Sequence, residues 1–176
     1  MKKLLIDSEY LKKAFNDRKV SVEELIKNCF GKLNYPDEIL SYGALSTIEE
    51  QEAYKKIKNF HNIEKGFITK SNGKYTQKAV DGYINIELYK CSQDEKVDLI
   101  YLLAGDGDLK PGAEYINEKN KRLVLITKQG QCSSELSKLS SEIVYLESIL
   151  NWKKVIVENF DNHFFNYIML KIQNKN

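Results

Sequence analysis

The sequence predicts an α/β fold built around a mostly parallel sheet. Short apolar runs alternate with longer amphipathic runs, and the links between them are short, which is the pattern of successive strand–helix units. The most apolar run is Val97–Ala104 (VDLIYLLA), bounded by charged residues and by glycine, as expected for a central strand buried on both faces. Because crossovers between parallel strands are right-handed, the carboxyl ends of these strands should meet at one edge of the sheet.

The other predicted strands are short apolar runs of the same kind. The first ends at Asp7, and the third is followed by Ser71-Asn72-Gly73-Lys74, a turn by composition. In chain order, the six predicted strands are Lys3–Ile6, Ile39–Leu45, Gly66–Lys70, Val97–Ala104, Arg122–Thr127 and Ile143–Leu146.

Helices are predicted between these strands from capping residues and from apolar residues at helical spacing. Ser21 with Glu24 forms a capping box before the second helix, and Thr47 caps the third. The predicted helices are Glu9–Phe15, Val22–Phe30, Glu49–Phe60, Gln77–Cys91, Gly112–Lys119, Ser133–Leu139 and Ser148–Val157. Phe160, Phe164 and Tyr167 then share one helical face, so the chain divides into a domain over residues 1–150 and a C-terminal helical extension over residues 151–176.

Composition excludes several classes of protein. With 176 residues, 42% of them hydrophobic and 30% charged, the chain is neither disordered nor fibrous. No apolar run has the roughly 18–20 residues that span a bilayer, and Asp7 and Glu9 interrupt the N-terminal apolar stretch too early for a signal peptide, so we expect a cytoplasmic protein with no membrane partner. The net charge of +2 gives no strong basic field. No phosphate-binding Walker loop and no dinucleotide fingerprint is present.

Carboxylates gather where ligands bind in open α/β sheets, beyond the carboxyl ends of the strands. Asp7 ends the first strand, Asp106 and Asp108 follow the central strand, and Asp81 opens a helix that carries Glu87 six residues later. Such a cluster needs a cation, and ligands that are all oxygen suit Mg²⁺ or Mn²⁺. The alternative reading is that Asp106 and Asp108 only cap the next helix and that Glu87 lies on a solvated face.

Three segments in order then carry a resemblance to a known family. They are LLIDSEYL, with its strand and aspartate; GFITKSNGKYTQKAVDGYINIELYK, with Lys-x-Val-Asp; and VDLIYLLAGDGDLKPGAEYI, close to an apolar strand followed by Ser-Gly-Asp-x-Asp-Phe. RLVLI and SSELSKLSSEIVYL match the closing strand, Ser-rich helix and final strand. Over Leu4–Leu146 the chain resembles NYN domains, the branch of the PIN-like nuclease superfamily that includes LabA-like proteins.

The resemblance implies a PIN-like three-layer sandwich and a metal-dependent ribonuclease that cuts single-stranded or structured RNA. By position, Asp7, Asp81, Asp106 and Asp108 would hold Mg²⁺ or Mn²⁺, and Glu87 would complete the cluster through a water. Lys78 would reach a phosphate, and Ser134 would supply a hydroxyl near the site. The implied reaction is in-line attack by a metal-activated water, which leaves 5′-phosphate and 3′-hydroxyl ends.

The sequence departs from the family pattern at three positions. Tyr10 replaces an asparagine, Glu87 replaces an aspartate, and Ala104 replaces the serine before Gly-Asp. Tyr10 is a candidate for stacking on a base. Lys70, Lys74 and Lys78, with Tyr75 interleaved, form either an edge that binds the RNA backbone beside the acids or a solvated loop.

Two other functions compete with the ribonuclease. One is a catalytically weak NYN module that binds RNA or a protein in a regulatory role, and the other is a Toprim-like phosphotransfer domain, which would need glutamate at the first strand end. The C-terminal helix over residues 151–176 is a candidate interface for a homo-oligomer or a protein partner.

Overall fold

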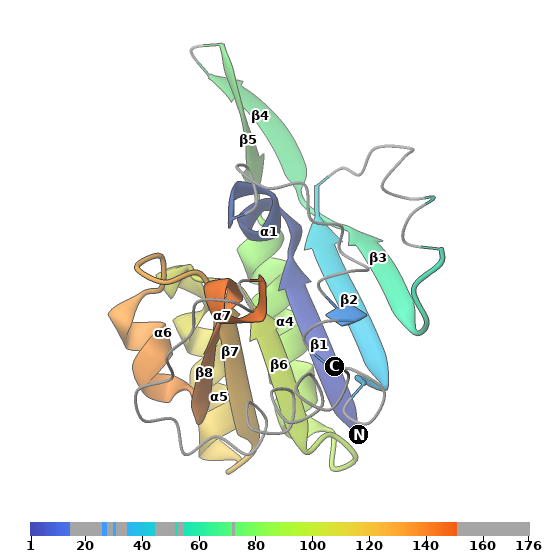
Figure 1. Ribbon diagram of the computed structural model, residues 1–176. Coiled ribbons are helices and arrows are strands. Elements are labelled where there is room, and N and C mark those ends of the chain that lie inside the picture. Colours follow the sequence, from blue (N-terminus) through green and yellow to red (C-terminus); the bar gives the residue numbers. More distant parts are fainter. Residues whose placement is uncertain are drawn as a thin grey trace.

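The computed structural model describes residues 1–14, 26–27, 30, 35–44, 52, 55–71 and 73–150. These residues form an α/β sandwich whose central layer is a six-stranded sheet (Figure 1). Its strands are β1 (Lys2–Asp7), β2 (Glu38–Gly43), β3 (Phe60–Glu64), β6 (Leu99–Leu103), β7 (Arg122–Thr127) and β8 (Glu142–Tyr145). Their order is β3-β2-β1-β6-β7-β8, and every neighbouring pair is parallel, so the predicted α/β class with a mostly parallel sheet is confirmed.

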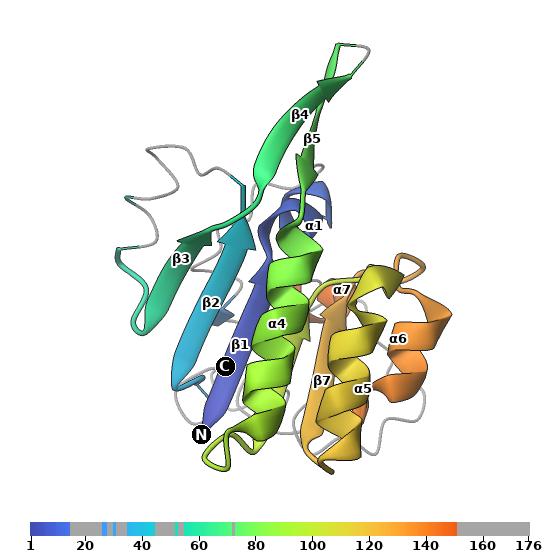
Figure 2. The ribbon, with the colours of Figure 1, turned by 180° about the vertical axis from the view of Figure 1, so that it is seen from behind.

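Helices cover both faces of this sheet. Figure 2 shows α4 (Val80–Gln93), α5 (Lys110–Glu118) and α6 (Ser134–Leu139) on one face. On the opposite face lie α1 (Ser8–Ala14) and α7 (Leu146–Leu150), so the described part of the chain has the three layers of a PIN-like sandwich.

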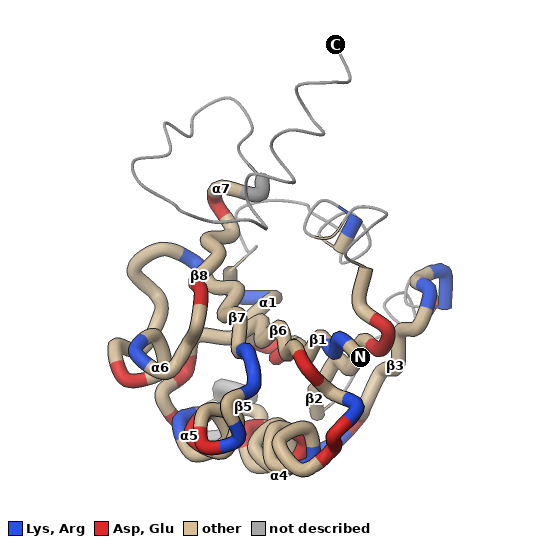
Figure 3. Tube along the Cα trace, turned by 90° about the horizontal axis from the view of Figure 1, so that it is seen from below, with Lys and Arg blue, Asp and Glu red and all other residues tan. Residues whose placement is uncertain are grey.

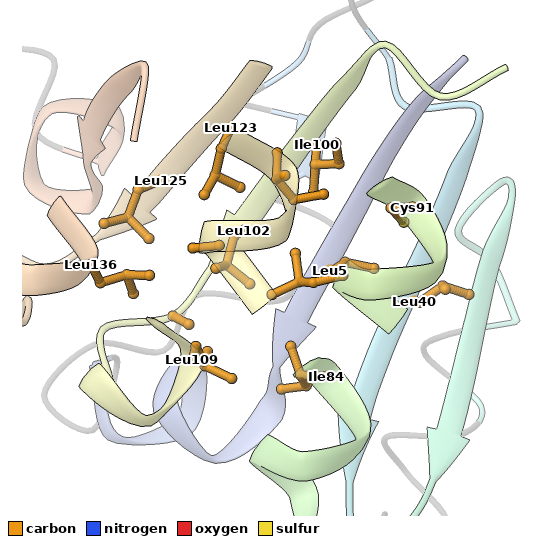
Figure 4. Close-up of a cluster of buried hydrophobic side chains, with 14 of the residues drawn as sticks. Leu5, Leu40, Ile84, Cys91, Ile100, Leu102, Leu109, Leu123, Leu125 and Leu136 are labelled. Carbon is orange, nitrogen blue, oxygen red and sulfur yellow. The ribbon is translucent and has the colours of Figure 1, made fainter. Parts of the chain in front are cut away.

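The alternation of side chains along each strand separates the core into two halves. Leu4 and Ile6 pack on the α1 side, whereas Leu5 packs on the side of α4, α5 and α6. Figure 4 shows this second half, in which Leu125 of the sheet lies beside Leu136 of α6, and Leu5 of the sheet lies near Ile84 of α4. Each such buried Leu or Ile stabilises the fold by about 1.5–3 kcal/mol. The two half-cores thus hold the carboxyl ends of β1 and β6 at a fixed separation.

A β-hairpin extends from the carboxyl edge of the sheet. Its strands, β4 (Phe67–Ser71) and β5 (Lys74–Lys78), pair antiparallel in a two-stranded sheet of their own, which stands away from the sandwich in both views (Figures 1 and 2). The prediction that residues 66–70 join the main sheet is therefore wrong. The helix predicted from Gln77 begins at Val80, because Gln77 and Lys78 pair with Ile68 and Phe67 instead.

Strand β3 was not predicted. Its residues FHNIE are at most half-buried, because they form the edge of the sheet, and the short polar-apolar mixture resembles the end of a helix. The predicted helices over residues 22–30 and 49–60 fall largely outside the described residues, as does the extension over residues 151–176.

Charges of both signs are interspersed on the side where the strands begin, as Figure 3 shows for α4 and α5. Among the described residues, no helix combines the length and the hydrophobicity needed to span a bilayer.

Candidate metal centre at the carboxyl edge

The strand order changes direction between β1 and β6. The chain moves outward in one direction through β2 and β3, and in the other through β7 and β8, so the order reverses where β1 and β6 pair. In open α/β sheets, ligands bind beyond the carboxyl ends of the strands at this reversal. Asp7 is the last residue of β1, and Ala104-Gly105-Asp106 follow the end of β6.

Three aspartates meet at this place. One carboxylate oxygen from each of Asp81, Asp106 and Asp108 lies within 4.8 Å of the other two. Asp81 belongs to the first turn of α4. Asp106 caps the short 3₁₀ helix η1 (Gly107–Leu109) by accepting a hydrogen bond from the Asp108 backbone N–H at 3.0 Å. We call these three residues the aspartate trio.

The carboxylates of the aspartate trio repel one another. Burial raises the pKa of Asp81, and the charges of Asp106 and Asp108 raise it further. Within the described part of the chain, no lysine or arginine forms an ion pair with any of the three. Three converging oxygen donors with unbalanced negative charge match the ligand preferences of Mg²⁺ and Mn²⁺.

Asp7 lies next to the trio without belonging to it. Its buried carboxylate accepts hydrogen bonds from the backbone N–H groups of Glu9 (3.0 Å) and Tyr10 (3.1 Å), so it caps α1. Burial raises the pKa of Asp7 to about 6; the hydrogen bonds from Tyr10 and Glu9 lower it, and the charge of Asp81 raises it. The predicted fourth acid thus interacts electrostatically with the trio from a more buried position.

The loop that carries Asp106 is fixed by residues that sequence reasoning missed. A β-carbon at Gly105 would collide with the Gln131 carbonyl oxygen and would lie 2.6 Å from Cε2 of Tyr10, so only glycine fits. The backbone N–H of Ser133 donates to the Gly105 carbonyl at 2.9 Å.

Asn85 holds the other end of the loop. Its Nδ2 donates to the Asp108 carbonyl oxygen, and its Oδ1 accepts from the Gly112 backbone N–H, both at 2.8 Å. Asn85 stands one helical turn after Asp81 on α4, so this polar residue at spacing i+4 was the available signal. It ties Asp81 and Asp108 to one rigid frame.

The side chain of Tyr10, the residue predicted to stack on a base, is engaged inside the protein. Its hydroxyl is 2.7 Å from Oγ1 of Thr127 and accepts a hydrogen bond from the Lys128 backbone N–H at 2.8 Å. Its half-buried ring packs against the core on the α1 side. Because both the ring and the hydroxyl are engaged inside the protein, Tyr10 connects α1 to the end of β7 and to the Gly105 loop.

Glu87, predicted to complete the cluster through a water, lies apart from the trio and is paired with lysines. Its side chain is buried, and its position on α4 is about 9 Å from that of Asp81 along the helix axis. Its Oε1 is 3.3 Å from Nζ of Lys3, and its Oε2 is 3.3 Å from Nζ of Lys90. Glu87 is therefore neutralised by lysines within the fold.

Three of the predicted substrate residues lie on two elements, β5 and α6. Lys78 is exposed at the end of β5, three residues before Asp81, and Lys74 begins the same strand. Ser134 is exposed at the start of α6, whereas the neighbouring Ser133 contacts the acidic loop.

Lys13 is a basic residue near the site that the sequence analysis did not single out. Its Nζ pairs with Oε1 of Glu9 at 2.8 Å. The hydrogen bond to Glu9 raises the pKa of Lys13, and the charges of Asp7 and Asp106 raise it further. Its spacing of one helical turn from Glu9 was the only signal in the sequence.

Comparison with known proteins gives two findings. The family model of the NYN domain matches residues 3–147. A solved structure of a protein of unknown function from Vibrio parahaemolyticus superposes with a TM-score of 0.66 at 17% sequence identity, covering 84% of this chain and 93% of that one. At this identity the likeness shows the fold alone. No curated protein matches.

Proposed function

Because the chain belongs to the NYN domain family, a group within the PIN-like nucleases, we propose that it is a metal-dependent ribonuclease that hydrolyses RNA phosphodiester bonds at the aspartate trio. One observation carries the proposal: carboxylate oxygens of Asp81, Asp106 and Asp108 lie within 4.8 Å of one another. Like charges this close oppose each other's ionisation unless a cation stands between them.

The residues of the trio fit Mg²⁺ or Mn²⁺. All three donors are oxygens. Because the three residues belong to two rigid elements, α4 and η1 with its N-cap, the separation of the donors is fixed. A hard divalent cation prefers such donors. When bound, it would polarise the phosphodiester and lower the pKa of an attacking water.

The protein's own part in the reaction is to position these carboxylates before substrate arrives. Asn85 and Ser133 hold the Asp106–Asp108 loop from two sides, and Gly105 lets that loop pass close to Tyr10. Asp7 stands behind the trio and adds negative charge once it ionises. Lys78, Lys74 and Lys13 lie on elements that border the site and supply cations for the RNA backbone. In this proposal the protein is cytoplasmic, and RNA is its partner.

A cleavage assay tests the proposal. Mixed single-stranded and structured RNA, and DNA, are incubated with Mg²⁺, Mn²⁺ or EDTA, using wild type, Asp106→Asn and Glu87→Gln. Asp106→Asn should lower the rate by about 10³-fold, because several kcal/mol of transition-state stabilisation depend on the site. Glu87→Gln makes the same acid-to-amide change away from the trio and should keep most of the rate. Equal metal-dependent rates for wild type and Asp106→Asn would overturn the assignment.

The alternative is an NYN module that binds RNA or a protein with little catalysis. It is favoured by Tyr10, whose hydroxyl is committed to Thr127 and Lys128 and whose ring is packed in the protein. That position therefore offers no free polar group to a substrate. Metal-dependent stabilisation of the wild type without cleavage of any substrate would support this alternative.

A further inference from the structure

The net positive charge of the chain is concentrated in the segment that forms the β4–β5 hairpin. Residues 65–80 contain four lysines and no acidic residue, out of 27 basic and 25 acidic residues in the whole chain. The remaining 23 basic and 25 acidic residues give a formal charge of −2, against +4 for the hairpin segment. A surface of this charge beside three carboxylates complements a polyanion, whose phosphates would otherwise be repelled from the acidic site.

The hairpin also exposes apolar side chains that a solvated arm would not need. Phe67 is 58% exposed and Ile68 is 40% exposed. Neighbouring residues of a strand point to opposite faces, so each face of the hairpin carries one of them. In the register, Phe67 lies opposite the exposed Lys78. An aromatic ring next to a lysine is the arrangement that stacks a base and holds its phosphate.

The root of the hairpin fixes its direction. The Lys65 backbone N–H donates to the Gly43 carbonyl at 2.9 Å, and Oε1 of Gln77 accepts from the Ala44 backbone N–H at 2.5 Å, so both strands are tied to the end of β2. Gly66, at φ 99°, lets the chain pass the Lys78 carbonyl, where a β-carbon would collide.

The root also sets how far the hairpin stands from the acidic site. Ala79, at φ 68°, turns the chain from β5 into α4. Lys78 is three residues before Asp81, a span of at most about 11 Å. The base of the hairpin therefore stands within about two nucleotides of the trio.

We propose that the β4–β5 hairpin is an arm that binds single-stranded RNA and leads it to the aspartate trio. The inference rests on the proposed ribonuclease function and names its substrate class. Single strands are favoured over duplexes because only unpaired bases offer their faces to Phe67. A phosphate next to the stacked base would lie near Lys78, which shares the face of Phe67, and Lys70, on the other face with Ile68, would contact a phosphate further along the strand.

Binding without cleavage tests the arm separately from catalysis. All proteins carry Asp106→Asn and are measured in EDTA by fluorescence anisotropy with a 12-nucleotide single-stranded RNA over a series of salt concentrations. Lys70→Gln/Lys78→Gln should reduce affinity at least tenfold and lower the slope of log affinity against log salt by about 1.4, since each phosphate contact on a single strand contributes about 0.7. Phe67→Ala should reduce affinity about 5- to 100-fold and leave that slope unchanged.

Lys96→Gln/Lys119→Gln is the matched control, because it removes the same charge from exposed positions at the opposite edge of the sheet. It should leave the slope unchanged. The proposal that the hairpin binds RNA is contradicted if the hairpin variants have the same RNA affinity as this control. It is also contradicted if the parent protein does not bind the RNA, or if Phe67→Ala alters only the oligomeric state. Failure of wild type to cleave RNA would count against the ribonuclease proposal alone, because no step of the binding test depends on cleavage.

Discussion

Helix α4 carries acidic residues in opposite circumstances at its amino end and at its middle. At the amino end, Asp81 faces Asp106 and Asp108, and the described residues supply no ion pair to any of them. Further along, the buried Glu87 lies 3.3 Å from Lys3 and from Lys90. One helix therefore presents an unbalanced cluster at its amino end and a balanced cluster at its middle.

The balanced cluster is complete without any ligand. Lys3 also pairs with Glu38 at 2.7 Å, and the Tyr42 hydroxyl interacts with the charge of Glu87. Burial and then the charge of Glu87 raise the pKa of the Tyr42 hydroxyl, so it stays protonated and able to donate. The contrast shows that clustered acids indicate a metal site only when the protein leaves their charge unpaired.

The largest expected stability effect concerns Asp7 and pH. Its pKa in the folded protein is about 6, above the ordinary value of 3.8, so the folded state holds a proton that the unfolded state releases. The stabilisation is complete below about pH 4 and is lost as pH rises through 6. In EDTA, the free energy of unfolding of wild type relative to Asp7→Asn should fall by about 3 kcal/mol between pH 4 and pH 7.

Urea unfolding at both pH values, without metal, measures this difference. Asparagine keeps an oxygen that can cap α1, so the variant isolates ionisation from the loss of the cap. If the difference in unfolding free energy between wild type and Asp7→Asn stayed constant with pH, it would contradict the raised pKa of the buried Asp7 carboxyl.

Glu87→Gln probes the balanced cluster and should have a smaller effect. The amide keeps the size of the side chain but loses its charged hydrogen bonds to Lys3 and Lys90, while Glu38 still neutralises Lys3. Hydrogen bonds to charged groups are worth about 1.5–3 kcal/mol, so we expect a loss of about 2 kcal/mol in the free energy of unfolding. The same variant should keep the response of wild type to Mn²⁺, and loss of that response would place Glu87 in the metal site after all.

Tyr10→Phe should have the smallest effect. It removes the hydroxyl that contacts Thr127 and Lys128 but retains the packed ring, which should lower the free energy of unfolding by about 1 kcal/mol. The affinity of the Asp106→Asn protein for single-stranded RNA should stay the same when this change is added. A weaker affinity in that background would restore Tyr10 as a substrate contact.

Those parts of the site that lie directly at strand ends could be predicted from the sequence. Asp7 follows a short apolar strand, and Asp106 and Asp108 follow the most apolar run in the chain, so the topology of a parallel sheet suffices to bring them to one edge. The second hairpin strand β5 and the edge strand β3 were not predicted, because short strands at an edge lack a clear apolar period.

The contacts of Tyr10 and Glu87 could not be predicted from the neighbouring sequence. Tyr10 meets Thr127, 117 residues away, and Glu87 meets Lys3, 84 residues away. Each is a polar residue near a predicted site, and only the long-range partner decides whether its polar group remains available. Such partners depend on packing between strand and helix layers, which periodicity in the sequence does not encode.

The central claim is that a divalent cation completes the aspartate trio, and thermal unfolding with increasing Mn²⁺ tests it most directly. The melting temperatures of wild type and of Glu87→Gln should both rise with the concentration of Mn²⁺, since a ligand that binds only the folded state stabilises it. Asp106→Asn should gain little at the same concentrations. Equal gains for wild type and Asp106→Asn, or no gain for wild type, would contradict the account.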